Sequence, residues 1–186
     1  MTQNKRLIIL ISATLIVVGL LTVPSVLQSV SGDLIVAVIL FAWLIVFTIT
    51  YSVPLVDGAL SLMPMTVVAA YLTLGRVPAA WATIAAMLLH AGVRRWRAEH
   101  HLGNSEPKGW DLIEVTTINI LMHVAGILSA GLVGERLGIS IPLTRLSPAI
   151  WVRLIVTFIT YLGVNYFLAA LYLLMRSWEA VAGYVK

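Results

Sequence analysis

One apolar stretch of the sequence carries a regular series of polar and small residues. They recur at spacings of four, three, four and four, at Asn119, His123, Gly126, Ala130 and Gly134. Such spacings place all of them on one face of a helix. Gly126, Ala130 and Gly134 form a small-xxx-small pattern, which lets a second helix approach closely and predicts helix packing. Asn119 and His123 continue the same face with an amide and an imidazole, which can hydrogen-bond to a ligand or to a neighbouring helix.

A second apolar stretch carries a matching polar series, at Arg153, Thr157, Tyr161 and Asn165. These residues recur every four positions and therefore also share a helical face. If the two stretches form neighbouring antiparallel helices, counting from their outer ends places Asn119 and Asn165 at one depth. The same count places His123 opposite Tyr161.

Two interpretations of this polar layer remain open. In the first, Asn119, His123, Tyr161, Asn165 and Arg153 line a pocket between helices that binds a small ligand or senses the membrane, because polar groups at membrane depth are costly and often functional. In the second, they form interhelical hydrogen bonds that only fix the packing, worth roughly 0.6–2 kcal/mol per contact.

The most polar part of the chain contains the segment RRWRAEHH. Arg94, Arg95, Trp96 and Arg97 are typical anchors of a spanning helix at the membrane–water interface, where anionic lipids add attraction. The segment is short and borders an apolar run, which favours lipid contact over nucleic acid. Its adjacent histidines diverge on a helix, and no second ligand pair has a suitable spacing, so we expect no metal site.

Recognisable catalytic motifs are missing from the sequence. It has no Gly-rich phosphate loop, no Ser-His-Asp arrangement and no H-E-x-x-H signature. It also has no cysteine, which excludes disulfides, thiolate metal sites and cysteine nucleophiles. We therefore expect a protein that is not an enzyme and that needs no cofactor.

The composition is that of an integral membrane protein. Of the 186 residues, 60% are hydrophobic and only 11% are charged, whereas soluble domains are closer to a quarter charged. Such a chain cannot cover a water-facing surface with charge. Few residues lie outside the apolar runs, so we expect one compact membrane domain.

The apolar runs predict an all-α, polytopic membrane protein with a six-helix transmembrane bundle, because about 20 apolar residues cross the hydrocarbon core. The domain covers 1–186, and its spans are about 7–27, 34–51, 59–75, 79–93, 112–133 and 149–175. The stretch YSVPLVDGALSLMPM before the third span is ambiguous: it is compatible with a crossing or with a re-entrant hairpin. Asp57-Gly58 marks a turn, and Pro64 would lie in the first turns of the helix, where proline is tolerated.

Loop charges predict the orientation of the six spans. Eight basic residues fall on the side of the N-terminus, at Lys5, Arg6, Arg94, Arg95, Arg97, Lys108, Arg176 and Lys186. Four fall on the opposite side, at Arg76, Arg136, Arg145 and Arg153. Because Lys and Arg accumulate in cytoplasmic loops, both termini and the 94–111 loop should be cytoplasmic. This balance favours a true crossing at 53–75.

The order of features resembles the N-terminal multi-span membrane domains, of sensor type, of bacterial cyclic-di-GMP signalling proteins with HD-GYP or GGDEF output domains. The residues that carry the resemblance lie within about 34–176, at Val53, Pro54, Leu55, Gly58, Ser61, Leu62, Gly75, Asn119, Gly138, Tyr161 and Asn165. It implies a sensory or scaffold module in the bacterial cytoplasmic (inner) membrane. Arg76 stands where that family usually has proline, and no output domain follows, so the resemblance implies no phosphodiesterase or cyclase activity.

Two alternatives compete with this interpretation. Substrate-binding S-components of energy-coupling factor vitamin transporters are similar in length and share a segment like 53–79, but usually have one helix before it rather than two. An accessory subunit of a larger membrane complex would equally have few catalytic residues. In each case the expected partners are membrane lipids and other membrane proteins or further copies of the chain, with no nucleic acid.

Overall fold

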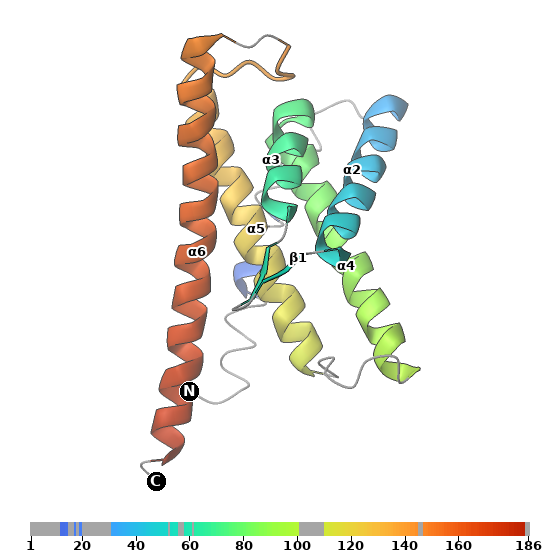
Figure 1. The fold of residues 1–186 in the computed structure, drawn as a ribbon, viewed down its shortest axis with the longest axis vertical. Helices are drawn as coiled ribbons and strands as arrows, with labels where there is room; N and C mark the ends of the chain where they lie inside the picture. Colours follow the sequence, from blue (N-terminus) through green and yellow to red (C-terminus); the bar gives the residue numbers. More distant parts are fainter. Residues whose placement is uncertain are drawn as a thin grey trace.

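Over the residues that the structure describes, the protein is α-helical with one pair of antiparallel strands (Figure 1). The computed structural model describes residues 12–14, 17, 19, 31–51, 53–55, 58–60, 62–100, 110–144 and 147–184. The elements follow in the order α2 (Gly32–Thr50), β1 (Val53–Leu55), β2 (Gly58–Leu60), α3 (Met63–Leu74), α4 (Arg76–Glu99), α5 (Trp110–Arg136) and α6 (Pro148–Tyr184). The predicted first span, 7–27, lies outside the described residues apart from helical positions at 12–14, 17 and 19.

Four of the described helices, α2, α4, α5 and α6, are long and apolar enough to cross a membrane. Two of them, α2 and α6, also present large apolar side chains outward, among them Val36, Leu40, Trp43, Phe47, Val152, Ile159, Phe167 and Leu174. Contiguous apolar surface of this kind is unfavourable in water and is typical of a face that contacts lipid or another protein. The α-helical membrane class predicted from composition agrees with these helices.

The structure has a pair of strands and a short helix where one continuous third span was predicted. Strands β1 and β2 pair antiparallel, with Pro54 opposite Ala59, and the helix begins only at Met63. Helix α3 has 12 residues, roughly 18 Å at 1.5 Å per residue, which is shorter than a hydrocarbon core of about 30 Å. The helix predicted over 59–75 is therefore too long at its start, whereas Pro64 does lie in the first turn of α3.

A single residue, Gly75, connects α3 to α4. Its φ of +90° lies in the region that glycine adopts without a Cβ clash. The Gly75 N–H donates to the Tyr71 carbonyl at 2.8 Å, and the Ala79 N–H donates to the Gly75 carbonyl at 3.1 Å. Helix α4 begins at once with Arg76 and runs to Glu99, so it is longer than the predicted 79–93 at both ends.

Helices α5 and α6 form an antiparallel pair (Figure 1). At one end the Tyr172 hydroxyl donates to the Glu114 carboxylate at 2.8 Å. At the other end the Arg153 guanidinium donates to the Gly138 carbonyl at 3.2 Å. Both helices contain the predicted spans, 112–133 and 149–175, and extend beyond them.

Tyr71 of α3 lies at the centre of the core, with 1% of its surface exposed. It packs against the small-residue face of α5, and its hydroxyl approaches the Gly131 carbonyl at 3.4 Å. A Cβ added at Gly134 would collide with the Tyr71 hydroxyl and would lie 3.3 Å from Thr157 of α6. Gly134 therefore makes room for α3 and α6 on the same face of α5.

We expect Gly134→Ala to lower the free energy of unfolding by about 1–3 kcal/mol, because the added methyl overpacks a filled core. Gly163→Ala is the matched control, since nothing lies within 4 Å of its Cβ position and alanine favours helix. Adding Tyr71→Phe to Gly134→Ala should recover part of the loss. Unfolding in detergent, followed by circular dichroism, measures all three; equal stability of the two alanine variants would contradict this packing.

Candidate functional site

A polar cluster joins α5 to α6 near the middle of their contact. The Tyr161 hydroxyl lies 2.6 Å from Nδ1 of His123, and Nδ2 of Asn165 lies 2.8 Å from the same nitrogen. When the hydroxyl and the amide nitrogen both donate, Nδ1 is the acceptor and the imidazole carries its proton on Nε2. The cluster therefore joins the imidazole of His123 on α5 to a phenol and an amide from α6 through one ring nitrogen.

Close packing holds Tyr161 in this position. The residue is fully buried, and its ring lies nearly parallel to that of His123, at an angle of 25° with centroids 6.1 Å apart. A Cβ added at Gly126 would lie 2.9 Å from the Tyr161 ring, so only glycine accommodates the ring here. Gly126, from the predicted small-residue face, thus leaves the space that the Tyr161 ring of the polar cluster occupies.

The structure brings together three of the five predicted ligand or packing residues, His123, Tyr161 and Asn165. Asn119 is half-buried one turn before His123 on α5, but Asn165 bonds to His123 and not to Asn119. Arg153 is separate from the cluster, since it binds the Gly138 carbonyl near the other end of the helix pair.

The remaining predicted packing residues also lie on the α5 surface that faces other helices. Ala130 is buried in the main core, and Gly134 contacts Tyr71 and Thr157. Buried Thr157 donates its hydroxyl to the Arg153 carbonyl within its own helix, at 2.8 Å. The Thr157 hydroxyl therefore has its hydrogen-bond partner within α6, as hydroxyls in apolar helices commonly do.

The chemical options of the cluster are limited by its composition. It contains an imidazole, a phenol and an amide, with no carboxylate. Among the described residues, no group of three or more His, Cys, Asp or Glu side chains could hold a metal ion. The arrangement can stabilise one packing of α5 on α6, and its role in ligand binding stays a prediction.

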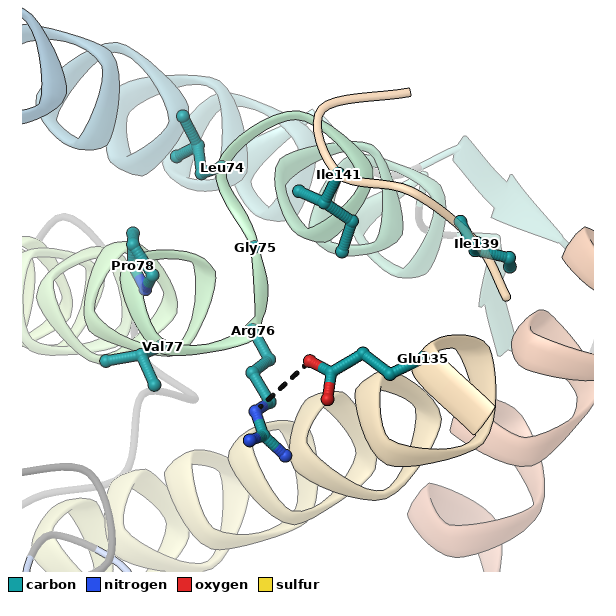
Figure 2. Close-up of a pocket in the computed structure, with 8 residues that line it drawn as sticks. All are labelled: Leu74, Gly75, Arg76, Val77, Pro78, Glu135, Ile139 and Ile141. Atoms are coloured by element: carbon teal, nitrogen blue, oxygen red, sulfur yellow. Dashed lines mark ion pairs between the residues drawn. The ribbon is translucent and has the colours of Figure 1, made fainter. Parts of the chain in front are cut away.

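A separate pocket of about 360 Å³ lies at the α3–α4 turn (Figure 2). Its lining comes from that turn, the end of α5 and the segment after it: Leu74, Gly75, Arg76, Val77, Pro78, Glu135, Ile139 and Ile141. Nε of Arg76 lies 3.3 Å from Oε1 of Glu135, and the two side chains are 34% and 43% exposed. The pocket therefore combines apolar walls with one cation and one anion.

Sequence reasoning did not identify Arg76 and Glu135 as site residues. In the sequence, Arg76 is notable as a basic residue of a turn and as a departure from the proline usual in the resembling family, and Glu135 belongs to none of the motifs. A usable signal was present, because both charges border apolar helices at turns on the same predicted side of the membrane. What sequence could not supply was the proximity of the first residue of α4 to the last turn of α5.

The predicted interface residues lie in the last two turns of α4. Arg95, Trp96 and Arg97 are exposed, and Arg94 is half-buried. Arg95 forms an ion pair with Glu99 at 2.8 Å, and the Trp96 ring packs at an angle on His100, with centroids 4.8 Å apart. Exposed Arg and Trp at a helix end are typical of the membrane–water boundary.

Comparison with known protein families, with curated proteins and with solved structures found no match for this chain.

A double-mutant cycle tests the polar cluster. We expect Tyr161→Phe and His123→Leu to be coupled by about 0.6–1.7 kcal/mol, between the average and the maximum measured for hydrogen bonds between membrane helices. A matched cycle of Asn119→Leu with Asn165→Leu should give a coupling close to zero, because Asn165 pairs with His123. Unfolding free energies in detergent supply both values, and a larger coupling for the two asparagines would refute this assignment.

Proposed function

We propose that the chain is a non-catalytic integral membrane module of sensory or scaffold type, in which α6 carries the state of the helix bundle to one membrane surface. The observation that supports this proposal most is the combination of a long, unbroken α6 with side-chain contacts to α5 at several levels. A helix held in this way moves as one piece when its packing changes, which is the property that a signalling helix needs.

The length of α6 supports this role. Its 37 residues span roughly 55 Å at 1.5 Å per residue, which exceeds the hydrocarbon thickness of about 30 Å. The helix continues beyond the level where Tyr172 meets Glu114 near the start of α5. A change in packing at His123 and Tyr161 would therefore be transmitted along α6 towards the aqueous side.

The proposed orientation places both termini and the 94–111 segment in the cytoplasm of a bacterium. The end of α4 and the start of α5 lie at the opposite end of the bundle from the α3–α4 turn and the start of α6 (Figure 1). In the predicted topology, eight of the twelve basic residues lie on the side that contains the 94–111 segment. Because basic residues favour the cytoplasm, this side is proposed to be cytoplasmic.

Cysteine labelling in intact cells tests this orientation. The sequence has no native cysteine, so only an introduced cysteine can react. Arg97→Cys, at the end of α4, should resist a membrane-impermeant maleimide until the cells are opened. Thr144→Cys, in the exposed segment after α5, should react at once. Labelling of Arg97→Cys in sealed cells would reverse the proposed topology.

Mass spectrometry of the particle released in mild detergent tests the sensory or scaffold role. We expect the chain alone, as a homo-oligomer or with a protein that has a soluble output domain. Co-purification with a pair of ATP-binding subunits would instead indicate a transporter S-component, and release only in a large assembly would indicate an accessory subunit. Either result would contradict the proposal.

A further inference from the structure

We propose that the pocket at the α3–α4 turn binds a small zwitterion with an apolar group, its anionic end on Arg76 and its cationic end on Glu135. This inference goes beyond the sensory or scaffold role and does not depend on it. It rests on the shape, lining and charge arrangement of the pocket.

The pocket has the volume of a small-molecule site. Its volume of about 360 Å³ falls within the range of roughly 300–1,000 Å³ usual for ligand pockets, which are mostly apolar with a few placed polar groups. Leu74, Val77, Pro78, Ile139 and Ile141 supply the apolar lining. An aliphatic group of the ligand would contact these side chains.

The wall formed by the segment after α5 is fastened at both ends. The Ile139 N–H donates to the Gly134 carbonyl at 2.9 Å, and the Leu143 N–H donates to the Leu72 carbonyl of α3, also at 2.9 Å. Ile141 lies between these two bonds and faces Gly75, whose Cβ position is 3.8 Å from its side chain. The wall is therefore held in place before a ligand arrives, which lowers the entropy cost of binding.

Arg76 and Glu135 provide opposite charges side by side at this pocket (Figure 2). Their contact runs through Nε of Arg76, whereas a guanidinium carries five N–H donors in a planar fork. Donors therefore remain for an anionic group, which Arg can bind in a bidentate way. The second oxygen of the Glu135 carboxylate can accept from an ammonium group.

The helix ends reinforce the same polarity. Arg76 is the first residue of α4, whose N-cap Gly75 offers no side chain to its N–H groups, and the positive end of a helix dipole favours an anion. Glu135 lies in the last turn of α5, where the dipole favours a cation. A ligand with one charge pairs with only one of the two residues, whereas a zwitterion pairs with both Arg76 and Glu135.

A packing role alone explains the Arg76–Glu135 pair less well. Both side chains are more than one-third exposed, and ion pairs as exposed as this contribute little to stability. The pocket would therefore keep its shape without the pair, and the pair is available to a ligand. The same chemistry occurs in a free amino acid and in the zwitterionic headgroup of phosphatidylethanolamine.

Isothermal titration calorimetry on the detergent-solubilised full chain tests whether the ligand is a free amino acid, with L-leucine as the probe. The matched controls are 4-methylpentanoate, which lacks the amine, and 3-methylbutylamine, which lacks the carboxylate. We expect saturable binding of leucine and binding about tenfold weaker or more for each control, because each lost charge removes a charge-assisted hydrogen bond. Native mass spectrometry from nanodiscs containing phosphatidylethanolamine or phosphatidylglycerol tests the lipid source.

Three variants separate recognition from folding. Arg76→Gln should abolish detectable leucine binding, and Glu135→Gln should let 4-methylpentanoate bind at least as well as leucine. The exchanged variant, Arg76→Glu with Glu135→Arg, keeps an ion pair but reverses the polarity; it should melt like the unaltered protein and bind leucine about tenfold more weakly. Selective retention of phosphatidylethanolamine without leucine binding would assign the site to lipid. Binding of neither probe, or leucine binding unchanged in all three variants, would overturn the proposal.

Discussion

The packing of two tyrosines on one glycine-rich face of α5 is the constraint on which the described bundle depends. Tyr71 reaches this face from α3 at Gly131 and Gly134, and Tyr161 reaches it from α6 at Gly126. Helices in a bilayer gain little from hydrophobic burial against one another, because lipid is equally apolar, so close packing must hold them together. Glycine allows the large rings to approach the α5 backbone, and α5 thereby contacts both α3 and α6.

This constraint also explains where polar groups are tolerated. A polar atom in the membrane interior needs a protein partner, because no water is available. His123, Tyr161 and Asn165 provide partners for one another, and the hydroxyl of Thr157 bonds within its own helix. A charged pair that joins two helices, Arg76 with Glu135, lies instead at helix ends beside an open pocket. The closed cluster suits a packing role, and the open pocket suits recognition.

Helix periodicity predicted much of the α5–α6 pair from sequence. The four-residue spacing placed His123 opposite Tyr161, and the structure brings these side chains to 2.6 Å. The same count paired Asn119 with Asn165, yet Asn165 bonds to His123, because a shift of a few ångströms along a helix changes which side chain is nearest. The stretch at 59–62 was predicted as helix but includes part of strand β2, since a short apolar run does not distinguish a strand from a buried helix.

The sequence by itself determined the class of protein, the main helices and the faces that meet, because these depend on composition and on a period of 3.6 residues. Turn residues also marked local boundaries, with Gly75 between α3 and α4 and Pro64 at the start of α3. Only the tertiary structure decided which groups share a site. Arg76 and Glu135 are 59 positions apart in the sequence, and no local pattern links them. They meet because α4 packs along α5, where Gly131 leaves room for the Arg76 side chain.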